Sequence, residues 1–136
     1  MKGFVMKSQS NFEKVREFNG AFGQPTGDTP MTPERMALRI ELIREEFKEV
    51  LEEAQQPLAH IDHPALMKEL ADLLVVTYGM GVELGYPMDE AFNLVHASNM
   101  SKLGEDGKPI YREDGKVLKG PNYKKADLTP LWDVVK

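Results

Sequence analysis

Apolar residues recur every three or four positions along most of the first hundred residues, which is the spacing of one face of an α-helix. This pattern predicts four helices, over about residues 10–22, 33–55, 64–84 and 89–100. The segments between them are rich in glycine and proline, which favour turns over helix. We therefore expect an all-α fold of the four-helix-bundle type.

The two long central helices should be covered on two sides. On the helix over residues 33–55, one apolar stripe runs through Met36, Ile40, Ile43, Phe47, Val50 and Ala54. Its flank carries further leucines, so a second side should be partly covered as well. The helix over residues 64–84 is apolar nearly all the way round from Leu70 to Leu84. Such a helix belongs in the interior of a bundle.

Residues 101–136 have a different pattern, typical of an irregular tail or a small hairpin. The Asp114-Gly115 pair lies between two short apolar runs and predicts a type I′ hairpin turn. Residues 101–125 carry seven Lys or Arg against four Asp or Glu, although the whole chain has a net charge of -5. An acidic helical body over residues 10–100 with a basic tail suits a metal-and-phosphate ligand better than a nucleic acid.

Composition narrows the class of protein. A length of 136 residues fits one domain, residues 1–136, with its own core. The absence of cysteine excludes disulfides and thiolate metal sites. No apolar run approaches the length of a membrane span or of a signal-peptide core. We therefore expect a cytoplasmic protein that binds neither membranes nor nucleic acids.

Two pairs of acidic residues stand apart from the ordinary helix charges. Glu46 and Glu49 lie beside the second apolar flank of their helix, and Glu69 and Asp72 lie on one face at the start of the next. Asp72 interrupts an apolar run, and a buried carboxylate needs an ion pair, hydrogen bonds or a metal. Two such pairs on neighbouring helices can converge into a four-carboxylate cage, which suits Mg²⁺ or Mn²⁺.

The acidic residues allow other interpretations. A single E-x-x-E pair is usually a solvated helix surface, and we assign Glu41, Glu45 and Glu52 to such a surface. A di-iron bundle usually carries Glu-x-x-His pairs, which these helices lack. His60, Asp62 and His63 lie in a predicted loop and could ligate a metal, although loop histidines beside a proline are more often simply exposed.

The motifs together resemble those of a known superfamily. E-E-x-x-E over residues 45–49, E-x-x-D over residues 69–72 and N-x-x-K at Asn99 and Lys102 resemble the all-α nucleoside triphosphate pyrophosphohydrolases. This superfamily includes MazG-like proteins, dimeric dUTPases and phosphoribosyl-ATP pyrophosphohydrolase. The tail from Ser101, SKLGEDGKPIYREDGKVLKGPNYKKADL, is similar to that of short, single-domain MazG-like proteins.

The resemblance implies a Mg²⁺-dependent enzyme that cleaves the α–β phosphoanhydride of an NTP or dNTP, releasing the monophosphate and pyrophosphate. It implies a homodimer or homotetramer. The residues implicated in catalysis are Glu46, which would orient the attacking water, and Glu49. The implied metal ligands are Glu46, Glu49, Glu69 and Asp72. The substrate-binding residues expected are Asn99, Lys102, Lys119 and Tyr123. From their chemistry alone, and not from the resemblance, Asn19 and Phe22 on the first helix are a polar and an aromatic candidate for holding the base.

Two alternatives stay open at this point. One is hydrolysis of phosphoribosyl-ATP, a reaction of the same superfamily, although the long tail makes it a poorer match. The other is a helical oligomer that binds nucleotides without catalysis. The long MazG proteins carry two tandem domains, whereas the motifs here occur once.

Overall fold

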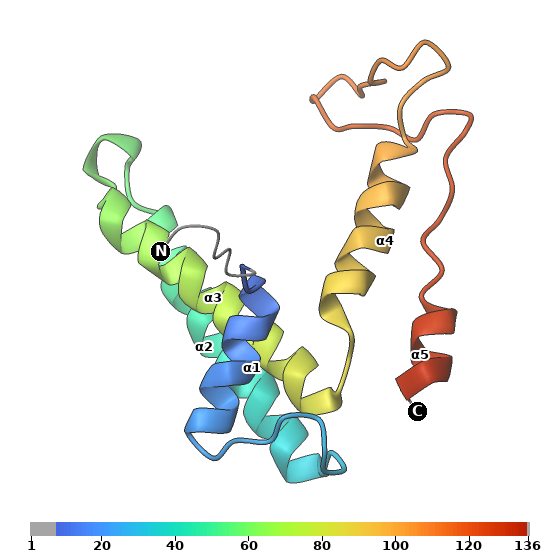
Figure 1. The fold of residues 1–136 in the computed structure, drawn as a ribbon. Coiled ribbons are helices and arrows are strands. Elements are labelled where there is room, and N and C mark those ends of the chain that lie inside the picture. The colour runs from blue at the N-terminus through green and yellow to red at the C-terminus, as the bar shows by residue number, and fades with distance from the viewer. Residues whose placement is uncertain (1–7, 136) are drawn as a thin grey trace, which may run out of the picture. The chain divides into compact units, whose positions relative to one another are not determined.

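The computed structural model describes residues 8–135, and the regular structure of this part of the chain is helical (Figure 1). No strand longer than an isolated bridge occurs in it, which confirms the prediction of an all-α fold. The five α-helices are α1 (Asn11–Ala21), α2 (Pro33–Ala54), α3 (His63–Leu84), α4 (Met88–Met100) and α5 (Thr129–Val135). A short 3-10 turn, η1 (Leu58–His60), lies between α2 and α3.

Capping residues fix the ends of α1, α2 and α3 close to the predicted bounds. The Ser10 hydroxyl accepts a hydrogen bond from the Glu13 N–H at the start of α1, and Thr32 does the same for α2. Asp62 caps α3 by accepting from the Ala65 N–H. At the other end of α3, Gly85 takes the left-handed conformation with a φ of 73°, which glycine adopts without steric cost.

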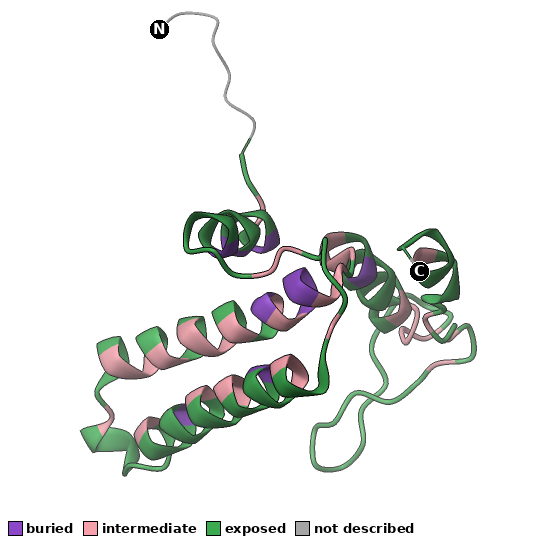
Figure 2. Cartoon of the chain, turned by 90° about the horizontal axis from the view of Figure 1, so that it is seen from below, coloured by how far each residue is buried: buried purple, intermediate pink, exposed green. Residues whose placement is uncertain are grey.

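The chain divides into two compact units, residues 1–86 and 87–136. In the first unit, α2 and α3 lie side by side (Figures 1 and 2). They run antiparallel, because Arg35 near the start of α2 is ion-paired with Glu83 near the end of α3. Helix α1 packs against α3, where the Phe12 and Tyr78 rings meet at 6.1 Å between centroids. That the whole chain forms a single domain stays a prediction.

Burial in the first unit is concentrated at one end of the helix pair (Figure 2). Phe12, Val15 and Val82 are among its buried apolar side chains. By contrast, Phe47 on α2 is 50% exposed and Leu74 on α3 is 55% exposed. A single chain therefore does not provide the two-sided cover that the apolar pattern predicted for the central helices.

The second unit contains α4, the basic tail and α5. An antiparallel bridge pairs Tyr111 with Val117, so the predicted hairpin is present in minimal form. Its turn is not of type I′, because that type needs positive φ at Asp114, and among the described residues only glycines have positive φ. Instead the Gly115 N–H donates to the Arg112 carbonyl and Gly115 has a φ of 88°. A three-residue loop ending in a left-handed glycine has this geometry.

Helix α5 was not predicted from the sequence. It is only seven residues long, which is too short for a recurring apolar pattern to be recognised. The local signal is Thr129 followed by Pro130, the same order that begins α2 at Thr32 and Pro33. The Asp127 side chain supports this start by accepting a hydrogen bond from the Thr129 N–H.

Among the described residues, none of the helices has both the length and the apolar character needed to cross a membrane.

Candidate active site

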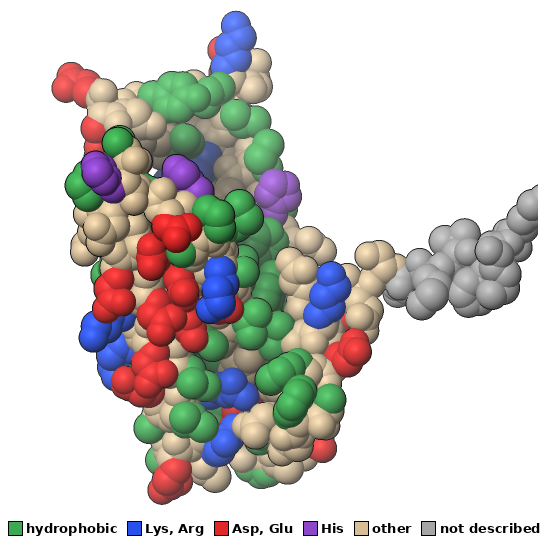
Figure 3. Space-filling model, turned by 90° about the vertical axis from the view of Figure 1, so that its left-hand side faces the viewer, with side chains coloured by type: hydrophobic (Ala, Val, Ile, Leu, Met, Phe, Trp, Pro, Cys, Tyr) green, Lys and Arg blue, Asp and Glu red, His purple; other side chains and the backbone are tan. Residues whose placement is uncertain are grey.

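Four carboxylates converge between α2 and α3. Glu46 and Glu49 come from α2, and Glu69 and Asp72 come from α3. One oxygen of each lies within 4.8 Å of the oxygens of the others. The i, i+3 spacing places each pair on one helix face, and the antiparallel packing of the helices turns these faces toward one another. Acidic side chains gather on the face of the molecule in Figure 3.

The cluster contains carboxylate oxygens without a partner. Glu46 Oε2 and Glu69 Oε2 are both buried and accept no hydrogen bond from the described residues. A buried oxygen without a partner is costly, since its hydration has been lost and nothing replaces it. Both oxygens belong to the same convergent group, so a cation bound there would satisfy them. The two unpaired oxygens therefore support a metal site more strongly than the presence of acidic residues alone would.

The electrostatics of the cluster also show a shortage of positive charge. A hydrogen bond with Glu49 is the main cause that raises the pKa of Glu69, and burial adds to it. Lys68 opposes this shift, because its Nζ lies 2.7 Å from Asp72 and 3.6 Å from Glu69. The Lys68 side chain is largely exposed, so its ammonium group is partly shared with water. Among residues 8–135, the solvated Lys68 alone does not balance the charge of the four carboxylates.

The donor set fits a hard divalent cation. All four groups are carboxylates, and oxygen ligands suit Mg²⁺ and Mn²⁺. The other metal-site candidate does not form in the part of the chain that the structure describes. There His60, Asp62 and His63 do not converge on one point. Both histidines are exposed, and the Asp62 side chain caps α3.

The predicted substrate-binding residues lie in the second unit. Lys119 Nζ lies 4.7 Å from the centre of the Tyr123 ring, a cation–π contact. The Gly120 N–H donates to the Lys102 carbonyl at 2.8 Å, which brings this tail segment against the end of α4. Asn99 is exposed on the last turn of α4. Three of the four residues are thus linked locally, and their contact with a substrate stays a prediction.

Further hydrogen bonds fix the tail to α4. The Ser98 hydroxyl donates to the Lys124 carbonyl at 2.8 Å, and the Lys124 N–H donates to Ser101 Oγ at 2.9 Å. A side chain at position 120 would not fit, because a Cβ there would lie 2.7 Å from the Lys102 carbonyl oxygen. The basic tail is therefore held in a defined conformation next to the N-x-x-K motif.

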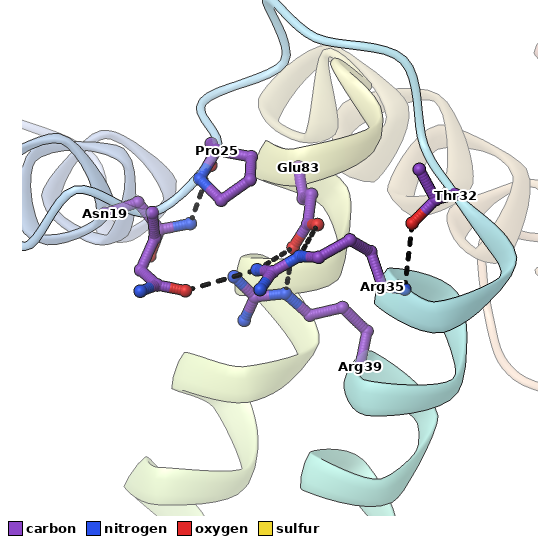
Figure 4. A network of polar contacts seen from close by, with 7 residues as sticks. Asn19, Pro25, Thr32, Arg35, Arg39 and Glu83 are labelled. Atoms are coloured by element: carbon purple, nitrogen blue, oxygen red, sulfur yellow. Dashed lines mark hydrogen bonds and ion pairs between the residues drawn. The ribbon is translucent and has the colours of Figure 1, made fainter.

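Sequence reasoning missed a buried ion-pair network at the opposite end of α2 and α3 (Figure 4). Arg39 and Glu83 are 6% and 2% exposed, and the Arg39 Nε donates to the Glu83 carboxylate. Arg35 donates two further hydrogen bonds to it. Burial raises the pKa of Glu83, but the bonds from Arg35 and Arg39 outweigh burial and hold that pKa below its usual value. The available signal was Glu83 itself, an acidic residue in an apolar helix, as with Asp72.

A pocket of about 400 Å³ opens beside this network in the first unit. Helices α1, α2 and α3 and the segment after α1 all contribute to it. It is lined by Val15, Phe18, Asn19, Phe22, Gln24, Arg39, Leu42, Val75, Val76 and Gly79. Asn19 and Phe22, the two residues expected to hold a base, thus line the same pocket. Their contact with a base stays a prediction.

Comparison with known proteins places the chain in a family. The family model described as phosphoribosyl-ATP pyrophosphohydrolase matches residues 15–99, which is more than half of the chain. The chain belongs to this family. The matched segment contains all four clustered carboxylates and Asn99. Because this family is one of those in the predicted superfamily, the resemblance to the all-α NTP pyrophosphohydrolases is confirmed.

Individual relatives are more distant. Protein L479 of Acanthamoeba polyphaga mimivirus, which is described as uncharacterized, is 27% identical over 116 residues. The match covers 81% of this chain and 42% of that protein, so this chain spans less than half of the relative's length. A solved structure from Exiguobacterium sp. 255-15, provisionally described as an NTP pyrophosphohydrolase, is 25% identical. It is matched over 94% of this chain and 95% of that chain with a TM-score of 0.46.

Proposed function

We propose that the protein is a Mg²⁺-dependent pyrophosphohydrolase that cleaves the α–β phosphoanhydride of an NTP or dNTP into the monophosphate and pyrophosphate. The observation that carries the proposal is the convergence of Glu46, Glu49, Glu69 and Asp72, with two buried oxygens left without partners. Membership of a pyrophosphohydrolase family supports the reaction class.

The four carboxylates would hold the divalent ion. When bound, such an ion would neutralise the triphosphate and lower the pKa of a water molecule beside it. Glu46 is the residue proposed to orient the attacking water, since its Oε2 lies in the cluster without a hydrogen bond. Glu49 would act with it, because its carboxyl already interacts with Glu69 in the same cluster. Mn²⁺ has the same ligand preference and should substitute.

The basic residues of the second unit would bind the phosphates. Asn99 and Lys102 are proposed to contact the triphosphate, and Lys119 and Tyr123 to contact the nucleotide from the tail. Positive charge near the leaving pyrophosphate would stabilise the charge that develops on it as the bond breaks. The local links among Lys102, Lys119 and Tyr123 support a shared role for these residues.

A homodimer or homotetramer is part of the same proposal. The α2 and α3 helices of one chain expose large apolar side chains, including Ile40, Phe47, Leu70, Leu74 and Val75. Covering such a surface is what drives association of identical subunits. Light scattering coupled to size-exclusion chromatography would measure the assembly. A monodisperse monomer at micromolar concentration would contradict this part of the proposal.

The decisive test is pyrophosphate release from a panel of NTPs and dNTPs with Mg²⁺, Mn²⁺ or EDTA. Glu49→Ala and Asp72→Ala should abolish release while leaving the helical circular dichroism spectrum unchanged. Glu45→Ala is the matched control, because Glu45 is exposed on α2 and outside the cluster. Full activity in either cluster variant would refute the metal-dependent mechanism.

Phosphoribosyl-ATP is a second candidate substrate. The matched family model supports it as well as it supports other nucleotides, because this compound carries the same triphosphate to be cleaved. Including it in the same panel separates the two candidates directly. Tight nucleotide binding without turnover under any divalent metal would instead support a non-catalytic binding protein.

A further inference from the structure

The pocket in the first unit has one aromatic and apolar wall and one polar edge. The Phe18 and Phe22 rings stack on each other with centroids 4.5 Å apart, and Val75 adds apolar surface. The polar lining residues are Asn19, Gln24 and Arg39, of which Asn19 is 3% exposed. A wall of this kind accommodates a flat heterocycle, and the polar edge can then recognise its substituents.

The pocket lies next to the carboxylate cluster along the helix pair. Leu42 precedes Glu46 by four residues on α2, and Val76 follows Asp72 by four residues on α3. Because the helices are antiparallel, both steps lead in the same direction, by about 6 Å. A nucleotide whose phosphates reach the cluster would therefore place its base in the pocket, with the sugar between them.

The hydrogen bonds already made in the network determine what the polar edge offers. Arg39 can only donate, and its Nε is occupied by Glu83. The Arg39 Nη1 atom lies close to Gly79, since a Cβ added to this glycine would be 2.9 Å from it. An Asn19 Nδ2–H donates to the Pro25 carbonyl at 3.2 Å, which fixes the orientation of the amide and leaves its oxygen available to accept from a ligand. The edge therefore combines a donor from Arg39 with an acceptor from Asn19.

We propose that this pocket binds the base of the nucleotide and that Arg39 selects bases with a lactam edge, in which a carbonyl adjoins a ring N–H. Uracil, thymine and guanine have this edge, and cytosine and adenine do not. Arg39 donates to the carbonyl, and the Asn19 oxygen accepts from the ring N–H. An amino base instead turns a donor toward Arg39, which leaves buried groups unpaired. The inference rests on the proposed function.

The test compares dUTP with dCTP, which share sugar, phosphates and ring size but differ at this edge. The kcat/KM for pyrophosphate release is measured alongside the Kd of the non-hydrolysable α,β-imido analogues by calorimetry. We expect wild-type protein to prefer the uracil nucleotide by about tenfold or more in both measurements. Arg39→Gln should bring the ratio close to one.

Arg35→Gln is the matched control, because Arg35 shares the Glu83 partner and does not line the pocket. Its base preference should equal that of wild type. Arg39→Lys keeps a positive charge beside Glu83 and serves if Arg39→Gln does not fold. The lysine lacks the guanidinium fork and should still reduce the preference. An equal shift in the Arg35 and Arg39 variants, or a wild-type preference for dCTP, would overturn the inference.

The two readouts also separate this inference from the proposed function. Arg39-dependent binding of the uracil analogue without any pyrophosphate release would support the base pocket and refute the enzyme. Pyrophosphate release with no Arg39-dependent preference would support the enzyme and refute the base pocket. Neither binding nor release by folded, Mg²⁺-supplied protein would refute both.

Discussion

Replacing Glu83 by glutamine should strongly destabilise the first unit. Glu83 is 2% exposed and is the common partner of Arg35 and Arg39. The substitution keeps the shape of the side chain and removes its charge. Because glutamine also presents an amide N–H₂ group, one of its ends would face the arginine donors without an acceptor.

The expected magnitude follows from the hydrogen bonds at Glu83. Arg35 donates from Nε at 2.6 Å and from Nη2 at 3.0 Å, and Arg39 donates from Nε. Glutamine keeps one acceptor oxygen, so about two bonds to a charged group are lost, at about 1.5–3 kcal/mol each. Breaking a buried ion pair by removing one partner costs about 3–5 kcal/mol. At roughly 4 °C per kcal/mol for a chain of this size, Tm should fall by about 10–20 °C.

Thermal and urea unfolding at one fixed protein concentration would measure the loss. The matched control is Glu41→Gln, which removes the exposed ion pair of Glu41 with Arg44 on α2. An exposed pair contributes at most about 1 kcal/mol, so this variant should unfold close to wild type. A Glu83→Gln variant that loses no more stability than Glu41→Gln would refute the argument that the buried network holds the helix ends together.

Three further predictions follow from particular groups. The pKa of Glu83 is lowered, so its stabilising effect is present above about pH 4.5 and is lost as pH falls through the folded-state pKa. Urea unfolding at about pH 7 and pH 3 should therefore show a smaller stability difference between wild type and Glu83→Gln in acid. An equal difference at both pH values would contradict this. Gly120→Ala brings a Cβ against the Lys102 carbonyl, so amide exchange over residues 119–124 should accelerate, and unchanged exchange would count against the close contact. Saturating Mg²⁺ at about 100 times its Kd should stabilise the protein by about 2.7 kcal/mol, and Glu69→Gln should largely remove this gain in a thermal shift assay; an equal gain in both proteins would place the metal elsewhere.

Much of the helical fold was predictable because its signals are local. Ser10 and Thr32 cap helices through bonds to residues three positions away, and Gly85 ends α3 through its own backbone conformation. The hairpin turn was predicted wrongly because an E-D-G sequence fits both a two-residue and a three-residue loop. The choice between them depends on φ at Asp114, which the sequence does not specify.

The candidate site was predictable in part for a similar reason. The i, i+3 spacing of Glu46–Glu49 and of Glu69–Asp72 fixes each pair on a helix face, so only the packing of two neighbouring helices had to be assumed. The pairing of Arg35 with Glu83 spans 48 positions. Such a pair depends on which turns of two helices lie opposite each other, and no local pattern encodes that.

The apolar pattern of α3 predicted a helix in the interior of a bundle, and the single chain does not bury it on all sides. Leu74 and Val75 belong to the apolar run, yet both are exposed in the single chain. Sequence patterns show that a residue favours burial without showing which surface buries it. The predicted oligomer would supply that surface from another copy of the same helices.

The antiparallel pair of α2 and α3 carries a carboxylate cluster toward one end and the Glu83 ion pairs at the other. The register of the two helices therefore decides whether the four carboxylates meet. Glu83 lies 11 residues beyond Asp72 on α3, which is about 16 Å along the helix. Sliding α3 by one turn relative to α2 would shift it by about 5.4 Å, which exceeds the 4.8 Å within which the four carboxylate oxygens gather. We expect the ion pairs of Arg35 and Arg39 with Glu83 to keep the carboxylates aligned, because these pairs fix the register of the same two helices. The connection over residues 55–62 can therefore vary in length, whereas an insertion within either helix between these two clusters would separate the carboxylates.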